Sequence, residues 1–449
     1  MMGSPEFRRN LWLEFSPHRL IAMPVILIAL FLLTTLGGHR GLNESSGSIA
    51  AFAFIVLIFV WGTRLAAEAV IGEVQDRTWD QQRLSTTGAW QMAWGKLFGA
   101  TAYAWYGGLI CLGFYAVSRA AHLTPGAVLT AGGLYIAAGV FAHALSLGLS
   151  LQAVQRRRAF GRVQVLWYQV VAVVAAGIPL YAGLKGLGGN GAYAMTHWFG
   201  HSISMAHFML AALAVFAAWS VAGVYALIRL EMMHRHGPWA WLGFVVFAMI
   251  FFGGLDYLPW NIPVILTALP GGLSAAFIVA AIATYAIAFG EPKQRVRFRR
   301  LAHEWQGGQW ERVLELMPRS VLTLGLAAGA AMAAGVMADT THFSNMAGVA
   351  EIRLAVLATV LFVIRDIGFV YAISLKHETG TGNADARAFL YLVVAYTLLP
   401  ALAQTLDLTP LLAFFWPQWG EAALLTIVPP LMEVAVIGFL LRRRLASLP

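Results

Sequence analysis

Residues 50–71 have the sequence AAFAFIVLIFVWGTRLAAEAVI, and this stretch decides the fold class. A bilayer core about 30 Å thick needs a helix of roughly 20 mostly apolar residues, and this run meets that length. The whole chain agrees, because 59% of its residues are hydrophobic and only 11% are charged. Soluble domains are about half apolar and about a quarter charged. The sequence therefore predicts an all-α polytopic membrane protein.

Twelve stretches of this kind occur along the chain, and each is expected to form a spanning helix. The predicted spans are 20–37, 50–71, 97–118, 127–152, 163–184, 206–228, 239–257, 263–289, 321–338, 352–373, 388–405 and 421–441. The seventh and ninth spans are short. In the eighth span, Leu269–Gly272 is a candidate kink, because Pro270 removes a helical hydrogen bond.

The positions of Lys and Arg predict the orientation, because positively charged loops stay in the cytoplasm during insertion. With the N-terminus inside, 26 of the 30 Lys and Arg residues fall on the cytoplasmic side, and so do both termini. The densest groups are Arg156–Arg158, Lys293–Arg300 and Arg442–Arg444. The net charge of +9 is thus explained by topology and contact with the lipid bilayer, without a nucleic-acid partner. The expected location is a bacterial cytoplasmic (inner) membrane.

The ends of the chain and its cysteine content add further expectations. Phe7, Leu11, Trp12 and Phe15 recur at helical spacing and predict an interfacial N-terminal helix, with a mobile tail as the alternative. Residues 3–7 resemble a cloning scar and are set aside from functional reasoning, and no cleavable signal peptide is recognisable. The single cysteine, Cys111, excludes an intrachain disulfide, and no spacing typical of metal ligands occurs.

The polar stretch from Glu73 to Lys96, which follows the second span, is the most informative in the chain. No turn residue interrupts Asp76–Arg83, so a short helix is expected there, with Thr78 or Asp76 as its cap. Trp79 and Leu84 would supply its apolar contacts, and such a helix can dock in a groove of a soluble partner. The alternative is an ordinary solvated loop whose polar residues simply avoid the membrane.

This loop resembles the corresponding loop of ABC-2 family transporter permeases. The residues that carry the resemblance are Glu73, Thr78-Trp79-Asp80, Leu84-Ser85 and Gly95-Lys96, and the departures are Arg77 for a usual Gly and Thr87 for a usual Pro. The resemblance covers about the first 235 residues. It implies that the loop contains the coupling helix that contacts a separate ABC ATPase subunit. The implied contact residues are Glu73, Asp76, Arg77, Thr78, Trp79, Asp80, Gln82, Arg83, Leu84, Ser85, Gly95 and Lys96.

A shift of 301 positions aligns Leu13–Pro17 with Leu314–Pro318 and Arg64 with Arg365. Helices nine to twelve are therefore interpreted as a degenerate repeat of helices one to four, with chance similarity of apolar helices as the alternative. The predicted organisation is a six-helix permease core (1–235), a two-helix insertion with a cytoplasmic linker (236–308) and the four-helix repeat (309–449). The loop 376–383 of the second copy lacks the coupling features. A second cytoplasmic contact, or an interfacial helix held by lipid headgroups, is expected at 291–319.

Ionisable residues inside spans are costly, so they are functional candidates by default. The intramembrane polar candidates are Arg64, Glu68, His143, Arg365, Asp366 and Glu433. Arg64 and Glu68 can pair on one helix face, and a packing role is favoured for His143. Arg365 and Asp366 are adjacent and are expected to point in different directions, with Arg365 meeting a carboxylate of a neighbouring helix. The segment Lys185–Ser204 is partly amphipathic, and the resemblance implies that it forms short helices that dip into the outer leaflet.

The function that these features predict is the transmembrane subunit of an ATP-driven exporter, without catalytic residues or a metal site. No phosphate-binding Gly-Lys-Ser/Thr motif occurs, so ATP and Mg²⁺ are expected in the partner ATPase and no cofactor in this chain. A homodimer, or a heterodimer with a second permease, is expected, because one core supplies one coupling loop. A proton-coupled secondary transporter using Glu433 or Asp366 is the main alternative. A membrane-embedded acyltransferase is a weaker one.

Overall fold

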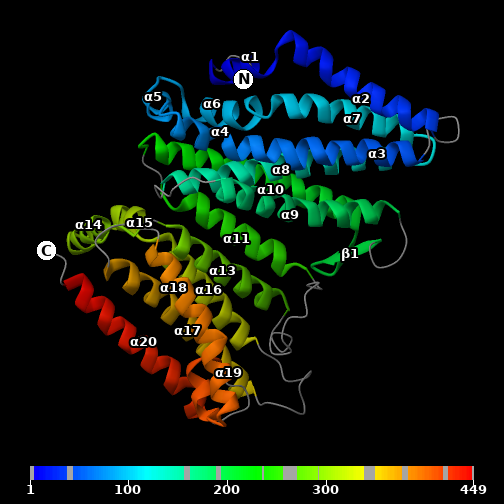
Figure 1. Cartoon of the computed structure of the whole chain (residues 1–449). Coiled ribbons are helices and arrows are strands. Elements are labelled where there is room, and N and C mark those ends of the chain that lie inside the picture. Colours follow the sequence, from blue (N-terminus) through cyan, green and yellow to red (C-terminus); the bar gives the residue numbers. More distant parts are fainter. Residues whose placement is uncertain are drawn as a thin grey trace. The chain divides into compact units, whose positions relative to one another are not determined.

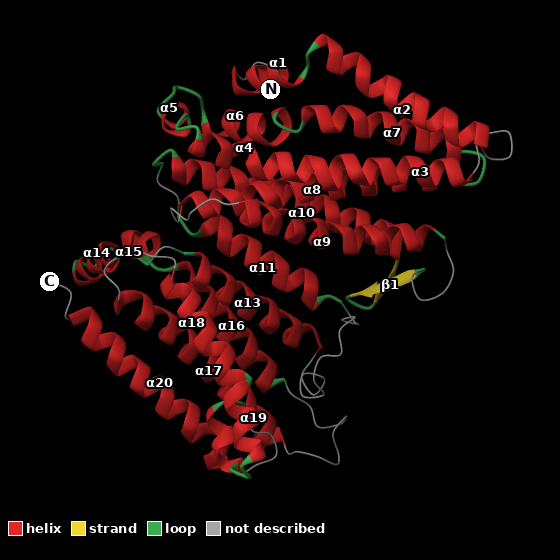
Figure 2. Ribbon diagram, viewed as in Figure 1, coloured by secondary structure: helices red, strands yellow, loops and turns green. Residues whose placement is uncertain are grey.

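Helices account for nearly all of the secondary structure in the computed structural model (Figure 2). The structure describes residues 5–37, 44–155, 162–188, 194–234, 237–255, 271–291, 293–337, 349–376, 383–417 and 423–446. The predictions for residues 3 and 4, Arg156–Arg158, the Leu269-Pro270 break and the loop 377–382 lie outside these ranges.

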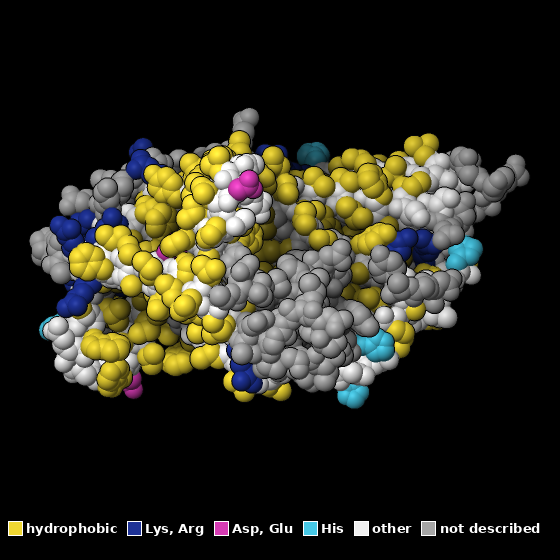
Figure 3. Space-filling view, turned by 90° about the horizontal axis from the view of Figure 1, so that it is seen from below, with side chains coloured by type: hydrophobic (Ala, Val, Ile, Leu, Met, Phe, Trp, Pro, Cys, Tyr) yellow, Lys and Arg dark blue, Asp and Glu magenta, His cyan; other side chains and the backbone are white. Residues whose placement is uncertain are grey.

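Ten helices of the described residues are long and apolar enough to cross a membrane. They cover Pro17–Thr35, Ser45–Gln75, Pro125–Gln155, Val163–Leu187, Met205–Glu231, Gly272–Gly290, Arg319–Val336, Arg353–Leu375, Ala384–Thr405 and Ala423–Leu445. Ala89–Gly99 and Ala102–Arg119 pass the same test together but are bent by 53°, and Trp239–Gly253 is a shorter apolar helix. Hydrophobic side chains dominate the described part of the face in Figure 3, as expected of a surface that meets lipid. The chain is an integral multi-pass membrane protein.

The chain divides into two compact units, which we describe separately (Figure 1). Unit 1 contains residues 1–196 and 201–236, and unit 2 contains residues 197–200 and 237–449.

Unit 1 is a bundle built around the long helix α8. The helices before α8 are α1 (Pro5–Glu14), α2 (Pro17–Gly37), α3 (Glu44–Phe54), η1 (Ile55–Gly62), α4 (Thr63–Gln75), α5 (Trp79–Arg83), α6 (Ala89–Trp94), η2 (Gly95–Gly99) and α7 (Ala102–Arg119). The bundle is completed by α8 (Pro125–Gln155), α9 (Arg162–Leu187) and α10 (Met205–Glu231). Helix α8 packs against α4, α9 and α10, while α7 packs against α3. Small residues such as Ala138 and Ala142 are fully buried on α8, which lets neighbouring backbones approach closely.

The second span contains a π-helical segment, η1, and side chains of α8 bond to one backbone carbonyl within it and one directly after it. His143 Nε2 lies 2.9 Å from the carbonyl oxygen of Ile58, and Ser146 donates to the carbonyl of Thr63 at 3.1 Å. Gly62 is required here, because a Cβ at this position would lie 2.5 Å from His143 Nε2. The buried His143 therefore has a packing role.

The segment Lys185–Ser204 differs from the prediction of amphipathic helices. Helix α9 continues to Leu187, and two short strands, β1 (Met195–Trp198) and β2 (His201–Ser204), form a two-stranded sheet. Phe199 and Gly200 have φ of 48° and 75°. Positive φ at both central residues is typical of the tight turn that matches the twist of a hairpin, and glycine favours it. The prediction missed this turn signal.

Unit 2 contains the remaining helices. They are α11 (Trp239–Gly253), α13 (Gly271–Gly290), α14 (Arg295–Gln306), α15 (Trp310–Leu316), α16 (Arg319–Val336), α17 (Val349–Lys376), α18 (Asn383–Tyr396), α19 (Leu398–Thr405), η4 (Thr409–Phe414) and α20 (Ala423–Ala446). Helix α13 packs against α11 and α16, and α17 packs against α16, α18 and α20. Helices α14 and α15, within the segment 291–319, form a hairpin whose tip carries the neighbouring side chains of Trp305 and Trp310.

Candidate functional site

The loop after the second span folds into a short helix, as the sequence predicted. Helix α4 ends at Gln75, and α5 follows after three residues. The predicted side-chain cap is absent, because the Thr78 hydroxyl donates instead to the carbonyl of Glu73, at 3.3 Å. The Thr78 amide donates to the same carbonyl at 2.9 Å. These two bonds fold the chain back on the end of α4 and set where α5 begins.

Arg77 has a left-handed backbone conformation, with φ of 58°. Side chains disfavour this region, because Cβ approaches the following carbonyl oxygen, whereas glycine adopts it freely. Arg77 therefore adopts a strained backbone conformation in the turn between α4 and α5.

Lys96 is the centre of a buried charge network at the start of the third span. Its side chain is only 1% exposed. The ammonium lies 2.8 Å from Glu6 Oε1, pairs with Glu73 Oε2 and donates to Gln82 Oε1 at 2.8 Å. It also lies 5.7 Å from the centre of the Trp79 ring. Lys96 thus ties together helix α1, the end of α4 and helix α5.

Arg9 supplies the second cation of this network. Its guanidinium binds Glu6 Oε1 at 3.0 Å and Glu73 Oε1 at 2.6 Å. The network therefore contains two cations and two carboxylates, so its charges balance. Buried charges are stable only when they are paired in this way, and removing one partner is costly.

Helix α1 contributes to the site through its polar face. Glu6 and Asn10 are buried, whereas Trp12 is 82% exposed. Asn10 donates to the carbonyl of Gly95 at 3.0 Å, and a Cβ on Gly95 would lie 2.6 Å from Glu6 Cγ. Glu6, one of the residues 3–7 that the sequence analysis sets aside, pairs with both cations of the charge network. Trp12 and Leu13 are left exposed, as a helix lying at a membrane surface requires.

Trp79 anchors α5 to the end of α10. The Trp79 side chain is 3% exposed and packs in a cluster with Val70 and Ile228. Its Nε1 donates to Glu231 Oε2 at 3.5 Å, and Arg83 lies 3.7 Å from the same oxygen. Trp79 is thus an internal anchor of the loop.

The remaining predicted contact residues of the loop lie at its surface. Asp76, Arg77, Thr78, Asp80, Leu84 and Ser85 are exposed. Leu84 is 83% exposed although it is a large apolar side chain, and Asp80 pairs with Arg83 at 2.9 Å. The loop therefore has a fixed base, formed by Glu73, Trp79, Gln82, Gly95 and Lys96, and an exposed tip, formed by Asp76, Arg77, Thr78, Asp80, Leu84 and Ser85.

The polar candidates inside the spans form two different arrangements. Arg64 and Glu68 pair at 3.0 Å, with 59% and 41% of their side chains exposed. Arg365, Asp366 and Glu433 come together in unit 2. The prediction that Arg365 meets a carboxylate on a neighbouring helix is confirmed by Glu433 of α20, at 2.8 Å. The prediction that Arg365 and Asp366 point apart is wrong, because Arg365 Nε donates to Asp366 Oδ1 at 2.8 Å.

Two tyrosines that the sequence analysis did not identify complete this Arg365 cluster. Tyr285 of α13 and Tyr396 of α18 both donate to Asp366 Oδ2, at 2.6 and 2.7 Å. Arg365 also donates to the carbonyl of Phe414 at 2.9 Å and to the Tyr396 hydroxyl at 2.7 Å. The cluster connects five elements of unit 2, α13, α17, α18, η4 and α20, through Arg365 and the fully buried carboxylate of Asp366. No periodicity marked the tyrosines, because they lie 81 and 30 residues from Asp366.

No family model, curated protein or solved structure matches this chain. Among the residues that the structure describes, no group of His, Cys, Asp and Glu side chains could hold a metal ion.

Proposed function

We propose that this chain is the transmembrane permease subunit of an ATP-driven transporter of the ABC-2 type, acting as an exporter. A separate ATPase subunit would bind the exposed tip of the 73–96 loop. The single observation that carries the proposal is the division of this loop into a buried, charge-paired base and an exposed tip with an unprotected leucine. The topology proposed is twelve spans with both termini on the cytoplasmic side of a bacterial inner membrane, in a dimer of permease chains.

The geometry of the loop suits the transmission of force. A displacement of α5 reaches α4 through Glu73, the third span through Lys96, and α10 through Trp79 and Glu231. Because these contacts are ionic or fully packed, α5 moves as one body with the ends of three spans. Rigid-body motion of helices around a central path is the usual means by which transporters alternate access. Nucleotide chemistry would occur in the partner, with ATP and Mg²⁺ bound there.

The test changes only the exposed tip. The double variant Asp80→Lys and Leu84→Asp alters two exposed side chains; it removes the Asp80–Arg83 pair but leaves the residues of the base unchanged. The ATPase that co-purifies with the tagged chain is identified first, and both are then co-expressed. We expect the double variant to reduce complex formation by about tenfold or more, because a central apolar residue and a charge often dominate an interface.

The control places the same kinds of change on another exposed helix. Arg443→Glu and Leu445→Asp reverse a charge and replace a leucine at two exposed positions near the end of α20 and should leave the complex intact. If the two double variants bind the ATPase equally well, or if no ATPase binds the wild-type chain, the proposal is wrong. Trp79→Ala is a poor probe, because it removes a buried anchor and destabilises the loop itself.

A proton-coupled secondary transporter is a second candidate, supported by the Arg365 cluster. Two carboxylates and one guanidinium in the interior of predicted spans are typical of proton or ion pathways. This candidate predicts transport by the purified chain in liposomes with a proton gradient and no ATPase, and loss of that transport in Glu433→Gln. The ABC-2 proposal predicts no such transport without the partner.

A further inference from the structure

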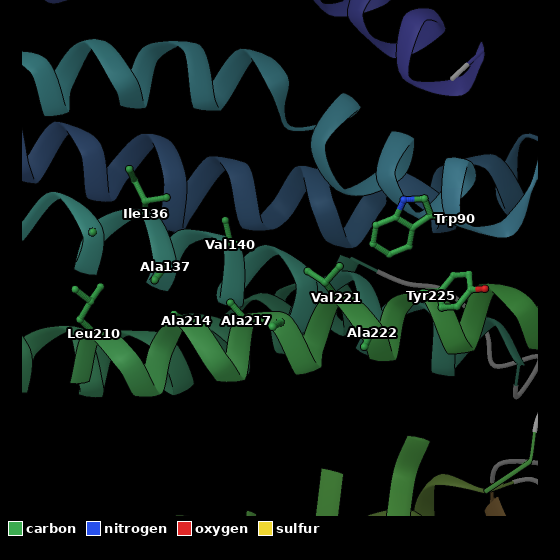
Figure 4. A pocket seen from close by; sticks show the side chains of 12 residues that line it. Trp90, Ile136, Ala137, Val140, Leu210, Ala214, Ala217, Val221, Ala222 and Tyr225 are labelled. Carbon is green, nitrogen blue, oxygen red and sulfur yellow. The ribbon is translucent and has the colours of Figure 1, made fainter. Parts of the chain in front are cut away.

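An apolar groove of about 830 Å³ runs along unit 1 between α8 and α10 (Figure 4). Ile136 and Val140 of α8 lie along one side, and Leu210 and Val221 of α10 lie along the other. Its lining along α10 also includes alanines, of which Ala218 is exposed. Small side chains between larger ones leave a continuous hollow in the surface of the bundle.

The dimensions of the groove fit a hydrocarbon chain. The lining residues of α10 extend from Leu210 to Tyr225, which corresponds to about 22 Å of helix at 1.5 Å per residue. A polymethylene chain can lie along a groove of this length, since its carbons contact neighbouring carbons at about 4 Å.

The two ends of the groove differ in polarity. Trp90 and Tyr225 lie at one end, in an edge-to-face contact with ring centroids 5.6 Å apart. The Arg229 guanidinium lies over the Tyr225 ring, 5.7 Å from its centre. Aromatic residues with a polar tip are typical of the level of lipid headgroups, and a nearby cation favours an anionic group. The end at Gly133 and Leu210 carries no charged residue.

We propose that this groove binds one acyl chain of a phospholipid from the surrounding bilayer, with the headgroup at the Trp90–Tyr225 end and an anionic headgroup preferred. The length of the groove and the polarity of its Trp90–Tyr225 end support this ligand, and the test below distinguishes it from a helix of a second copy of the chain. The inference is independent of the proposed transport function, since the site lies on unit 1 alone and needs no ATPase.

The test uses the full chain in nanodiscs of mixed phosphatidylcholine and phosphatidylglycerol. A trace of phosphatidylglycerol carries a diazirine in the middle of one acyl chain, and labelled peptides are mapped by mass spectrometry after irradiation. We expect labelling to concentrate on 133–140 and 210–225. Ala218→Phe fills the groove and should reduce this labelling by about tenfold, because the bound chain loses its contacts. The same probe on phosphatidylcholine should label the groove less.

The matched control is Ala333→Phe, the same substitution at an exposed alanine of α16 in unit 2, which should leave the labelling unchanged. Uniform labelling of all apolar helices, or equal labelling of the two variants and the wild type, overturns the proposal. A second copy as the occupant is tested with Ala218→Cys in a Cys111→Ala background, which carries no other cysteine. A disulfide-linked dimer in high yield in the membrane would assign the groove to a protein interface and also overturn the proposal.

Discussion

The Lys96 network and the Arg365 cluster both pair cations with carboxylates, but they differ in how far these groups are exposed. The Lys96 network joins two cations to two carboxylates where the second and third spans meet a polar loop, and Arg9 and Glu73 remain partly exposed in it. The Arg365 cluster joins one cation to two carboxylates, and Asp366 is fully buried between α13, α17 and α18. If both carboxylates are ionised, the Arg365 cluster has a surplus negative charge and the Lys96 network has none.

This difference shows how each cluster depends on its cation. Water can replace part of a lost partner at the edge of the Lys96 network, because Glu73 is partly exposed. In the Arg365 cluster only the tyrosine hydroxyls remain to stabilise Asp366 when the guanidinium is removed. The same loss should therefore cost more in unit 2 than in unit 1.

Arg365→Leu is expected to have the largest effect, because it leaves Asp366 buried without a cation. The expected loss is about 3–5 kcal/mol of stability, or failure to accumulate folded protein. Arg64→Leu is the control, since the 301-residue shift aligns it with Arg365 but its side chain is 59% exposed. The control should lose no more than about 1 kcal/mol. Both are measured by unfolding in mixed micelles of increasing SDS content. Equal losses would contradict the comparison.

Lys96→Met should come next, with a loss of about 2–4 kcal/mol, since Glu6 and Glu73 lose their shared partner. If the contact between Lys96 and Glu6 stabilises the protein, the double variant Lys96→Met and Glu6→Gln should lose less free energy of unfolding than the sum of the losses of the two single variants. A double-mutant cycle measures this coupling, which is expected to be about 1–3 kcal/mol for groups in contact. If the losses of the two single variants are additive, Glu6 of α1 is not coupled to Lys96 and the network is refuted.

Gly62→Ala tests the contact between η1 and His143. Unit 1 has neutral polar contacts of this kind inside its spans, whereas unit 2 has the charged Arg365 cluster. The added methyl group would collide with His143, so a loss of about 1–3 kcal/mol is expected. Gly72→Ala is the control, because nothing lies within 4 Å of its Cβ. It should be neutral or gain up to about 1 kcal/mol from helix propensity. His143→Ala should remove most of the penalty of Gly62→Ala, and persistence of the full penalty would place its cause elsewhere.

The sequence predicted the helical spans and the short helix of the loop well, because both depend on local composition. Runs of apolar residues predict spans wherever they occur, and ten of the predicted spans correspond to helices long and apolar enough to cross a membrane. The network partners depend on contacts between distant positions, such as Glu6 with Lys96 and Tyr285 with Asp366. No spacing rule joins residues 90 or 81 positions apart. The 301-residue repeat stays a prediction.

The residue types of the loop could be predicted, but the division between base and tip could not. Trp79 and Leu84 are both large apolar residues in or next to α5, and the sequence predicted that both supply the apolar contacts of this short helix. The structure buries Trp79 against α4 and α10 and exposes Leu84. The distinction depends on the direction in which α5 leaves α4, which the strained turn at Arg77 sets.

Arg77→Gly should have the smallest effect and the opposite sign. Glycine accepts φ of 58° without strain, so the variant should gain up to about 1 kcal/mol, reduced by the greater freedom of glycine in the unfolded chain. Asp76→Gly is the control, because Asp76 has φ of −78° and gains nothing from glycine. A loss of stability in Arg77→Gly as large as that in Asp76→Gly would show that the Arg77 side chain, rather than the backbone conformation, is what the turn requires.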